Sequence, residues 1–202
     1  MSKLVIGITG GIGSGKSTLS NLFEESGHKV ILSDDIAKEL MFNDENVKNN
    51  IIAEFGKECY TNGELNTKVL AERVFNHPDQ IKKINSIVHP PTITKIKIQI
   101  KDYLKKYSLV FVESALIFEA KMVDIFDYVL LITADEDTRI KRVLDRDIET
   151  VSEIKSRMMN QIPEEQKIGK SDFIIYNDSS LNHLKEKVNF FLNIFSTLPN
   201  KK

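Results

Sequence analysis

Gly10-Gly11-Ile12-Gly13-Ser14-Gly15-Lys16-Ser17 is the stretch that decides the fold of this chain. It fits the pattern G-x-x-x-x-G-K-[ST] of a phosphate-binding loop. The apolar run 4–8 before it predicts a strand, and apolar residues at helical spacing over 18–25 predict a helix. In a strand–loop–helix unit, the backbone N–H groups of the loop and of the helix N-terminus face a bound phosphate. The stretch therefore predicts a nucleotide site in an α/β domain.

Two side chains of the loop have separate predicted roles. The Lys16 ammonium would reach the β- and γ-phosphates, and the Ser17 hydroxyl would coordinate Mg²⁺. The dinucleotide pattern G-x-G-x-x-G does not fit, because its last glycine would fall on Lys16 or Thr18. We expect the nucleotide phosphates to lie against Gly11, Ile12, Gly13, Ser14, Gly15, Lys16, Ser17 and Thr18.

The composition narrows the class of protein. The 202 residues are 41% hydrophobic and 28% charged, which is typical of one soluble globular chain. The 28 Lys and Arg residues balance 29 Asp and Glu residues, so we expect no nucleic-acid and no membrane partner. The single cysteine, Cys59, excludes an intramolecular disulfide and fits a reducing cytoplasm. No signal-peptide pattern or membrane-length apolar run is found, and we expect a cytoplasmic monomer or weak homo-oligomer.

Further apolar runs predict a parallel sheet. They do not alternate with polar residues, which is typical of strands covered on both faces, and helical patterns separate them. We expect a three-layer α/β sandwich with strands over 30–32, 109–112, 128–132 and 173–176.

The spacing of the runs predicts the organisation of the chain. We expect residues 1–42, 108–146 and 170–197 to form the nucleotide-binding core, 43–107 a helical insertion, and 147–169 a lid. Pro90 and Pro91 indicate a boundary between two helical patterns. We expect the tail 198–202 to be frayed.

Two carboxylates follow predicted strands, where ligands gather in such sheets. Asp34 is a candidate general base, although it would equally serve as a helix cap, and Asp35 is a rival for the same role. Glu113 ends a strand and would hold Mg²⁺ through water, or would be a satisfied carboxylate near Lys16.

Three arginines form a stripe along one predicted helix. Arg139, Arg142 and Arg146 stand at i, i+3 and i+7. Such a stripe is either a solvated helix face or part of a lid that brings arginines onto transferring phosphates. The chain has no Asn-Lys-x-Asp motif, which disfavours a GTPase, and its helical insertion favours a small-molecule kinase.

Several motifs in order resemble the dephospho-coenzyme A kinase family. Beside the loop, these are Leu32-Ser33-Asp34-Asp35-Ile36-Ala37-Lys38, Val88-His89-Pro90, and Glu113-Ser114-Ala115-Leu116-Ile117-Phe118-Glu119. The sequence departs from the family pattern at three of these positions: Leu32 and Glu113 replace aspartates, and Ala115 replaces a proline. Arg139 stands where a glutamine is usual.

The resemblance implies a P-loop kinase that phosphorylates the ribose 3′-hydroxyl of dephospho-CoA with ATP and Mg²⁺. It implies catalytic roles for Asp34, Lys16, Arg142 and Arg146, nucleotide contact by Asn177, and Mg²⁺ ligation by Ser17 and Glu113. The implied substrate contacts are Asp34, Arg73, His89, Leu116, Phe118 and Glu119. Two alternatives remain: a nucleoside or nucleoside monophosphate kinase, and a nucleotide-binding regulatory protein that has lost catalysis.

Overall fold

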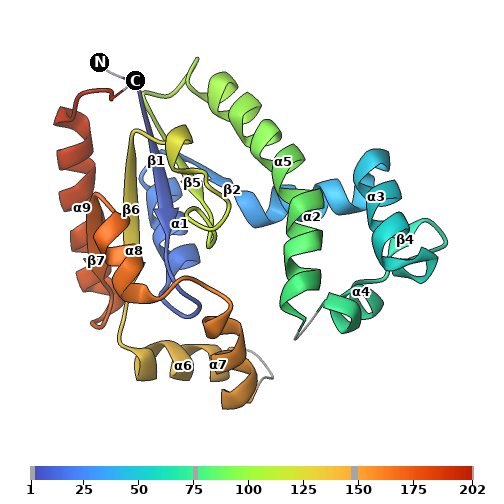
Figure 1. The fold of residues 1–202 in the computed structure, drawn as a ribbon. Helices are drawn as coiled ribbons and strands as arrows, with labels where there is room; N and C mark the ends of the chain where they lie inside the picture. The colour runs from blue at the N-terminus through green and yellow to red at the C-terminus, as the bar shows by residue number, and fades with distance from the viewer. Residues whose placement is uncertain (1–2, 75–76, 147–149, 202) are drawn as a thin grey trace. The chain divides into compact units, whose positions relative to one another are not determined.

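A computed structural model describes residues 3–74, 77–146 and 150–201. Its centre is a five-stranded sheet in the order β2-β5-β1-β6-β7, with every neighbouring pair parallel (Figure 1). The strands are β1 (Leu4–Thr9), β2 (Lys29–Leu32), β5 (Leu109–Glu113), β6 (Tyr128–Thr133) and β7 (Phe173–Tyr176). This confirms the predicted α/β class and all five predicted strands.

Helices connect the strands. They are α1 (Lys16–Glu25), α2 (Ser33–Asn43), α3 (Glu45–Phe55), α4 (Thr67–Val74), α5 (Pro78–Tyr103), α6 (Glu136–Leu144), α7 (Val151–Met159), α8 (Glu164–Lys170) and α9 (Leu181–Thr197). Two 3₁₀ turns, η1 (Lys57–Cys59) and η2 (Val123–Ile125), complete the helical elements of the described residues.

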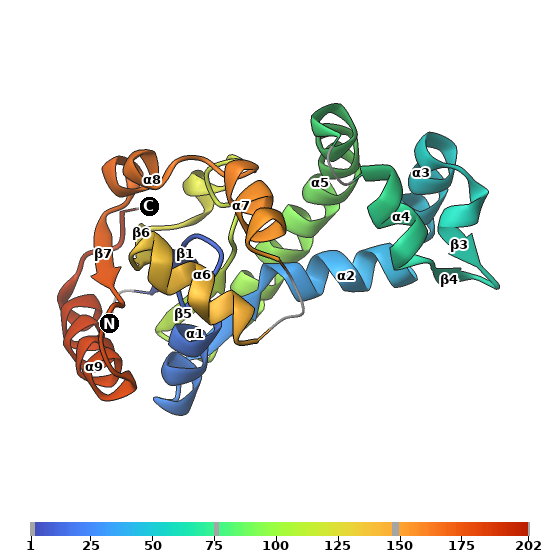
Figure 2. The same cartoon turned by 90° about the horizontal axis from the view of Figure 1, so that it is seen from below.

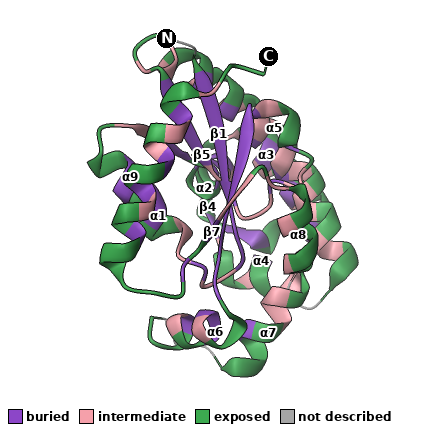
Figure 3. Ribbon diagram, turned by 90° about the vertical axis from the view of Figure 1, so that its left-hand side faces the viewer, coloured by how far each residue is buried: buried purple, intermediate pink, exposed green. Residues whose placement is uncertain are grey.

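The main core lies between the sheet and the helices α1 and α9. Strands β1 and β6 are buried along their length and β5 is buried except for its last residue, whereas the edge strands β2 and β7 are buried only in part (Figure 3). Phe23 of α1 stacks on Phe111 of β5 with ring centroids 4.0 Å apart, and Phe195 of α9 meets the same ring edge-on. On the other face, a Cβ at Gly7 would clash with Phe126 and Ile117, so β1 needs glycine there. This packing holds the carboxyl end of β1, and with it the glycine loop, in place.

The chain divides into two compact units. One consists of Met1–Leu32 and Gln99–Lys202, and the other of Ser33–Ile98. In the second unit α2 packs on α3, and η1 contacts both α3 and α4 (Figure 2). The functional division into core, insertion 43–107 and lid 147–169 stays a prediction. Residues 147–149 of that lid lie outside the described part of the chain.

The second unit also contains a small hairpin that the sequence analysis did not predict. Strands β3 (Tyr60–Thr61) and β4 (Glu64–Leu65) pair antiparallel around Asn62-Gly63. Both turn residues have positive φ, 53° and 86°, which a two-residue hairpin turn requires and which Asn-Gly favours. The Tyr60 hydroxyl donates a hydrogen bond to the Met41 carbonyl at 2.7 Å and so ties the hairpin to α2.

The predicted helix boundary at Pro90 and Pro91 is wrong, because α5 runs through both prolines. Each proline removes one backbone hydrogen bond, but the helix extends for several turns on both sides of them. Threonine hydroxyls add bonds to the same turns: Thr92 Oγ1 donates to the Val88 carbonyl at 2.8 Å, and Thr94 Oγ1 donates to the Pro90 carbonyl at 3.0 Å. The helical turns on both sides of the prolines therefore outweigh the local preference against a helix.

The prediction of a frayed tail is also wrong for residues 198–201. The Lys201 ammonium lies 2.7 Å from Asp172 Oδ1 and 4.0 Å from the centroid of the Tyr128 ring. The second oxygen of Asp172 accepts the Val129 N–H at 2.8 Å. A carboxylate that already binds a strand N–H therefore also anchors the cationic tail.

No helix in the described residues combines the length and the apolar character needed to cross a membrane.

Candidate active site

The glycine loop lies between the end of β1 and the start of α1. Gly15 caps α1 with φ 100°, and Gly13 has φ 76°, a region that favours glycine. A Cβ at Gly13 would clash with the Arg139 backbone, and one at Gly15 would clash with Asn177. These glycines therefore serve both the turn and the close approach of two later segments.

Asn177 holds the loop from beyond the end of β7. Its side-chain amide donates a buried hydrogen bond to the Ser14 carbonyl at 2.9 Å. Arg142 Nη2 in turn donates to the Asn177 carbonyl at 2.7 Å. The structure thus gives Asn177 a contact with the loop itself, and its predicted contact with the nucleotide stays a prediction.

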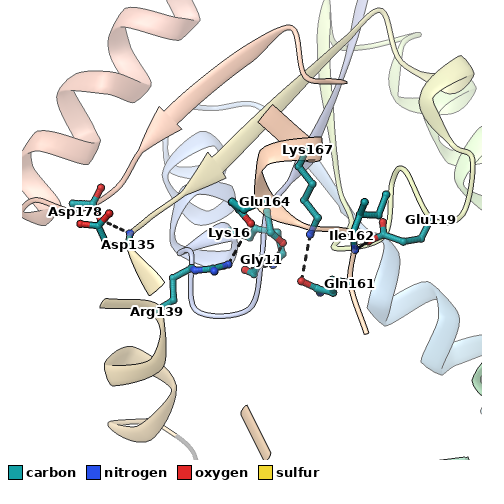
Figure 4. A network of polar contacts seen from close by, with 11 residues as sticks. Gly11, Lys16, Glu119, Asp135, Arg139, Gln161, Ile162, Glu164, Lys167 and Asp178 are labelled. Atoms are coloured by element: carbon teal, nitrogen blue, oxygen red, sulfur yellow. Dashed lines mark hydrogen bonds and ion pairs between the residues drawn. The ribbon is translucent and has the colours of Figure 1, made fainter. Parts of the chain in front are cut away.

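The Lys16 ammonium folds back over its own loop. It donates to the carbonyls of Gly10 at 3.0 Å and Gly11 at 3.2 Å (Figure 4). Because α1 begins at Lys16, the partial positive charge of the helix N-terminus adds to that of the ammonium. The place where a phosphate would bind is therefore electropositive.

A cavity of about 370 Å³ opens on the loop. Its lining includes Lys16, Ser17 and Thr18 from the loop side, and Arg142 and Arg146 from α6 and the segment after it. Three cations thus converge on one cavity. Such a charge distribution suits a polyphosphate chain.

Arg139 does not share this cavity, so the predicted stripe divides. Its side chain is buried and pairs with Glu164 of α8, with Nη1 3.3 Å from Oε2. Arg142 and Arg146 face the loop cavity instead. The three residues form neither a uniform solvated face nor a uniform lid surface.

Glu113 stands at the end of β5, opposite Leu32 of β2 in the sheet register. One of its oxygens accepts a hydrogen bond of 2.8 Å from the Ser20 hydroxyl. Ser20 is buried on α1, one helical turn after Ser17, and the sequence analysis did not single it out. The spacing of three residues from Ser17 was the available signal, because it puts both hydroxyls on neighbouring positions of one helix face.

The Ser17 hydroxyl and the Glu113 carboxylate suit Mg²⁺, which prefers oxygen ligands. The described residues contain no group of three or more His, Cys, Asp or Glu side chains arranged to hold a metal. A site with one carboxylate is nevertheless normal for Mg²⁺ bound together with nucleotide phosphates. The donor set of this site therefore fits the ion.

Three of the predicted acceptor residues belong to the unit Ser33–Ile98. Asp34 is exposed in the first turn of α2, next to Asp35, whose carboxylate lies 4.0 Å from the Lys38 ammonium. Arg73 pairs with Glu58 at 3.0 Å, and His89 lies inside α5. Their roles in binding and catalysis stay predictions.

Arg73 also lies beside the only cysteine. Its Nη1 is 3.9 Å from the Cys59 sulfur. Burial raises the pKa of the Cys59 thiol, and the charge of Arg73 opposes that shift only in part. A buried thiol with a raised pKa is a poor nucleophile, so Cys59 has no place in the site.

The remaining predicted acceptor residues, Leu116, Phe118 and Glu119, lie in the segment after β5. The Lys170 ammonium is 6.0 Å from the centroid of the Phe118 ring. Glu119 Oε1 accepts the backbone N–H of Ile162 at 2.9 Å (Figure 4). Glu119 thus ties the segment after β5 to the connection between α7 and α8, a contact that sequence spacing cannot reveal.

Lys167 is a fully buried cation near this contact. Its ammonium donates to Gln161 Oε1 at 3.3 Å. Burial lowers the pKa of Lys167, and the carboxylates of Glu119 and Glu164 oppose that shift. These groups form a polar network behind the glycine loop (Figure 4).

Known proteins resemble this chain along most of its length. Residues 4–183 match the family model described as dephospho-CoA kinase. Proteins named dephospho-CoA kinase include one of Coxiella burnetii, 36% identical and covering 92% of this chain and 93% of its own. Another, of Fusobacterium nucleatum, is 34% identical, and the match covers 95% of this chain and 98% of that protein.

Solved structures also resemble this chain along most of its length. A Thermus thermophilus protein superimposes with a TM-score of 0.81 at 30% identity, covering 96% of this chain and 98% of its own. The dephospho-CoA kinase of Campylobacter jejuni superimposes with a TM-score of 0.72 at 27% identity, and the match covers 95% of this chain and 96% of that chain. A shikimate kinase of Acinetobacter baumannii, 11% identical with a TM-score of 0.55 over 96% of this chain and 94% of its own, shares the fold alone. With a family model matched over residues 4–183 and relatives that are 34% and 36% identical over more than nine tenths of its length, the chain belongs to the dephospho-CoA kinase family.

Proposed function

We propose that this chain transfers the γ-phosphoryl group of ATP to the ribose 3′-hydroxyl of dephospho-CoA, yielding coenzyme A and ADP. Family membership over residues 4–183 supports the identity of the acceptor. The observation that carries the donor side is the cavity on the glycine loop, where Lys16, Arg142 and Arg146 converge. Cations in these positions suit the charge on a transferring phosphoryl group.

The loop and the two arginines have distinct roles in this proposal. The loop N–H groups and the N-terminus of α1 bind the β-phosphate region. Lys16 leaves the carbonyls of Gly10 and Gly11 and moves onto the β- and γ-phosphates. Arg142 and Arg146 stabilise the charge on the equatorial oxygens of the transferring group.

Ser17 and Glu113 would hold Mg²⁺. When bound there with ATP, the ion would supply positive charge that offsets the negative charge of the phosphates. Ser20 holds the Glu113 carboxylate through its hydrogen bond of 2.8 Å. This contact fixes the longer side chain that stands here in place of the aspartate usual in the family.

Asp34 is the proposed general base. Its carboxylate takes the proton of the 3′-hydroxyl as that oxygen forms a bond to the γ-phosphorus. The bond between the γ-phosphorus and its bridging oxygen breaks, and ADP leaves with that electron pair. Asp35 is the alternative base.

The acceptor is held by Arg73 and His89 of the insertion 43–107 and by Leu116, Phe118 and Glu119. The segment 147–169 closes as a lid over the phosphates. We further propose that the enzyme works in the cytoplasm as a monomer or weak homo-oligomer, without a nucleic-acid partner. The near-balanced charge and the single cysteine support this part of the proposal.

An ADP-release assay with a panel of acceptors tests the proposed function. We expect turnover with dephospho-CoA and at most background rates with nucleosides or nucleoside monophosphates. Lys16→Ala is the control for contaminating kinases. Turnover that prefers a nucleoside would favour the alternative kinase, and acceptor-independent ATP binding without turnover would favour a regulatory protein.

A further inference from the structure

Arg139 touches the glycine loop at two points. Its backbone carbonyl lies against Gly13, and its guanidinium lies against Gly11. A Cβ at Gly11 would clash with Arg139 Nη1 and would stand 3.2 Å from Glu164 Oε2. The Arg139–Glu164 pair is therefore packed directly on the loop backbone (Figure 4).

This ion pair is buried and incompletely satisfied. The side chains of Arg139 and Glu164 are only 11% and 19% exposed. Arg139 Nε and Glu164 Oε1 are buried and have no hydrogen-bond partner among the residues that the structure describes. Desolvation makes such a pair weak evidence for stability, whereas removing one partner alone leaves a costly unpaired charge. A role in positioning the loop accounts better for the pair.

The surroundings of the pair explain why it is needed. A cavity of about 620 Å³ lies beside it, lined by residues 133–136 at the end of β6 and the start of α6 and by the connection between α7 and α8. Polar contacts hold the connection, among them Ile162 to Glu119 and Lys167 to Gln161. Through Arg139, Glu164 ties the start of α8 to the glycine loop.

A short series of contacts leads from the pair to the loop lysine. Glu164 orients Arg139, and Arg139 packs against Gly11. The Gly11 carbonyl accepts a hydrogen bond from Lys16 Nζ at 3.2 Å. A displacement of Gly11 would move both the loop N–H groups and the partner of the lysine.

We propose that Arg139 and Glu164 are a positioning pair that sets the conformation of the loop at Gly11 and thereby the affinity for ATP. The inference rests on the proposed function, since it assumes that ATP binds at this loop. Position 139 is one at which this sequence departs from the glutamine that the family resemblance implies.

A double-mutant cycle tests the pair, with ATP affinity measured by calorimetry in the absence of acceptor. We expect Arg139→Gln and Glu164→Gln each to weaken ATP binding by about tenfold, because either change breaks the pair that holds Gly11. The double variant should bind ATP about as weakly as either single variant, because no pair remains to be lost by the second change. The KM for ATP rises in parallel, while the KM for dephospho-CoA stays within about twofold.

Lys29→Gln is the matched control. It removes the exposed ion pair of Lys29 with Glu24, which joins β2 and α1 at 3.6 Å and is 35% and 42% exposed. We expect no change in ATP affinity from it. Arg139→Lys, which keeps the charge but loses the planar fork, should give an intermediate ATP affinity and decides the question if Arg139→Gln does not fold.

Single variants that lower the melting temperature but leave ATP affinity within twofold would overturn the proposal, as would losses that simply add in the double variant. Failure of the proposed function has a different signature. In that case the unmodified protein does not bind ATP, or Lys16→Ala does not affect binding. A normal response to Lys16→Ala with no response at Arg139 and Glu164 rejects only the positioning pair.

Discussion

The glycine loop and the compact unit Ser33–Ile98, which we propose binds the acceptor and call the acceptor unit, hold their candidate residues in different ways. At the loop, the decisive contact joins Asn177 to Ser14 across 163 positions of sequence, and it is buried. In the acceptor unit, Arg73 pairs with Glu58 only 15 positions away, and Asp35 pairs with Lys38 within one helical turn. Both of these pairs are substantially exposed.

This difference suggests that the loop is organised before ATP binds, whereas the residues of the acceptor unit take their final positions when the substrate binds. Buried long-range contacts fix the loop before ATP arrives, and this preorganisation supports electrostatic catalysis. Exposed short-range ion pairs contribute little stability and are easily exchanged. The residues of the acceptor unit can therefore change partners when the substrate binds.

Lys16→Ala should give the largest effect. Removing the cation that contacts the transferring phosphates should lower kcat by about 10³-fold or more, an electrostatic contribution of a few kcal/mol. Because Lys16 Nζ donates to carbonyls of its own loop, at Gly10 and Gly11, and joins no distant segments through these bonds, the melting temperature should change little. The ADP assay and a thermal scan measure the two quantities. Turnover within tenfold of the unmodified protein would contradict the role of the loop.

Asp34→Asn should rank second. The amide keeps the size of the side chain but cannot accept the proton, so kcat should fall by about 10²–10⁴-fold if Asp34 is the base. Asp35→Asn is the matched control and should cost little, because it removes only an exposed ion pair of 4.0 Å. ATP affinity should survive in both. The reverse ranking of the two variants would identify Asp35 as the base.

Asn177→Ala tests whether the glycine loop is stabilised more strongly than the acceptor unit. It leaves the buried Ser14 carbonyl without its partner, which should cost about 1–3 kcal/mol of unfolding free energy. The KM for ATP should rise as the loop loosens. Arg73→Ala is the counterpart from the acceptor unit, and it should raise the KM for dephospho-CoA with little loss of stability. Equal stability losses in both variants would show that the two regions are held alike.

Tyr60→Phe tests the acceptor unit by pH and should give the smallest effect. Burial raises the pKa of Tyr60 to about 12 from an ordinary 10.0. The folded state therefore keeps the phenolic proton above pH 10, where the unfolded state loses it, and this difference disfavours folding. The unmodified protein should lose stability relative to Tyr60→Phe as the pH rises from about 10 toward about 12, with no such relative change below pH 9. Urea titrations across this range measure it, and parallel pH curves would refute the assignment.

Elements that depend on neighbouring residues could be predicted from the sequence, and elements that depend on a wider structural context could not. The strands and the loop are local patterns, and all five strands formed where apolar runs predicted them. Asn62-Gly63 carried a local hairpin signal that the analysis overlooked. The course of α5 through Pro90 and Pro91 could not be read locally, because helical turns on both sides offset the missing bonds.

In the candidate site, too, some features follow from neighbouring residues and others depend on how distant segments pack. The nature of the loop residues follows from a contiguous motif, and so does the expectation of a nucleotide site. The expectation of a small-molecule kinase also required the absence of an Asn-Lys-x-Asp motif and the helical insertion. The separation of Arg139 from Arg142 and Arg146 does not, because all three occupy equivalent positions in a helical pattern. Only the packing of α6 against the loop and α8 decides which arginine is buried in an ion pair.

The sequence by itself determined the phosphate-binding loop, the parallel α/β architecture and the resemblance to dephospho-CoA kinases. Each rests on neighbouring residues whose spacing sets backbone geometry or one buried face. Only the tertiary structure decided three contacts: the hydrogen bond from Asn177 to the Ser14 carbonyl, the hydrogen bond from Ser20 to Glu113, and the ion pair of Lys201 with Asp172. These partners are far apart in the chain, and hydrogen-bond geometry exists only once the fold has brought their atoms within about 3 Å of each other.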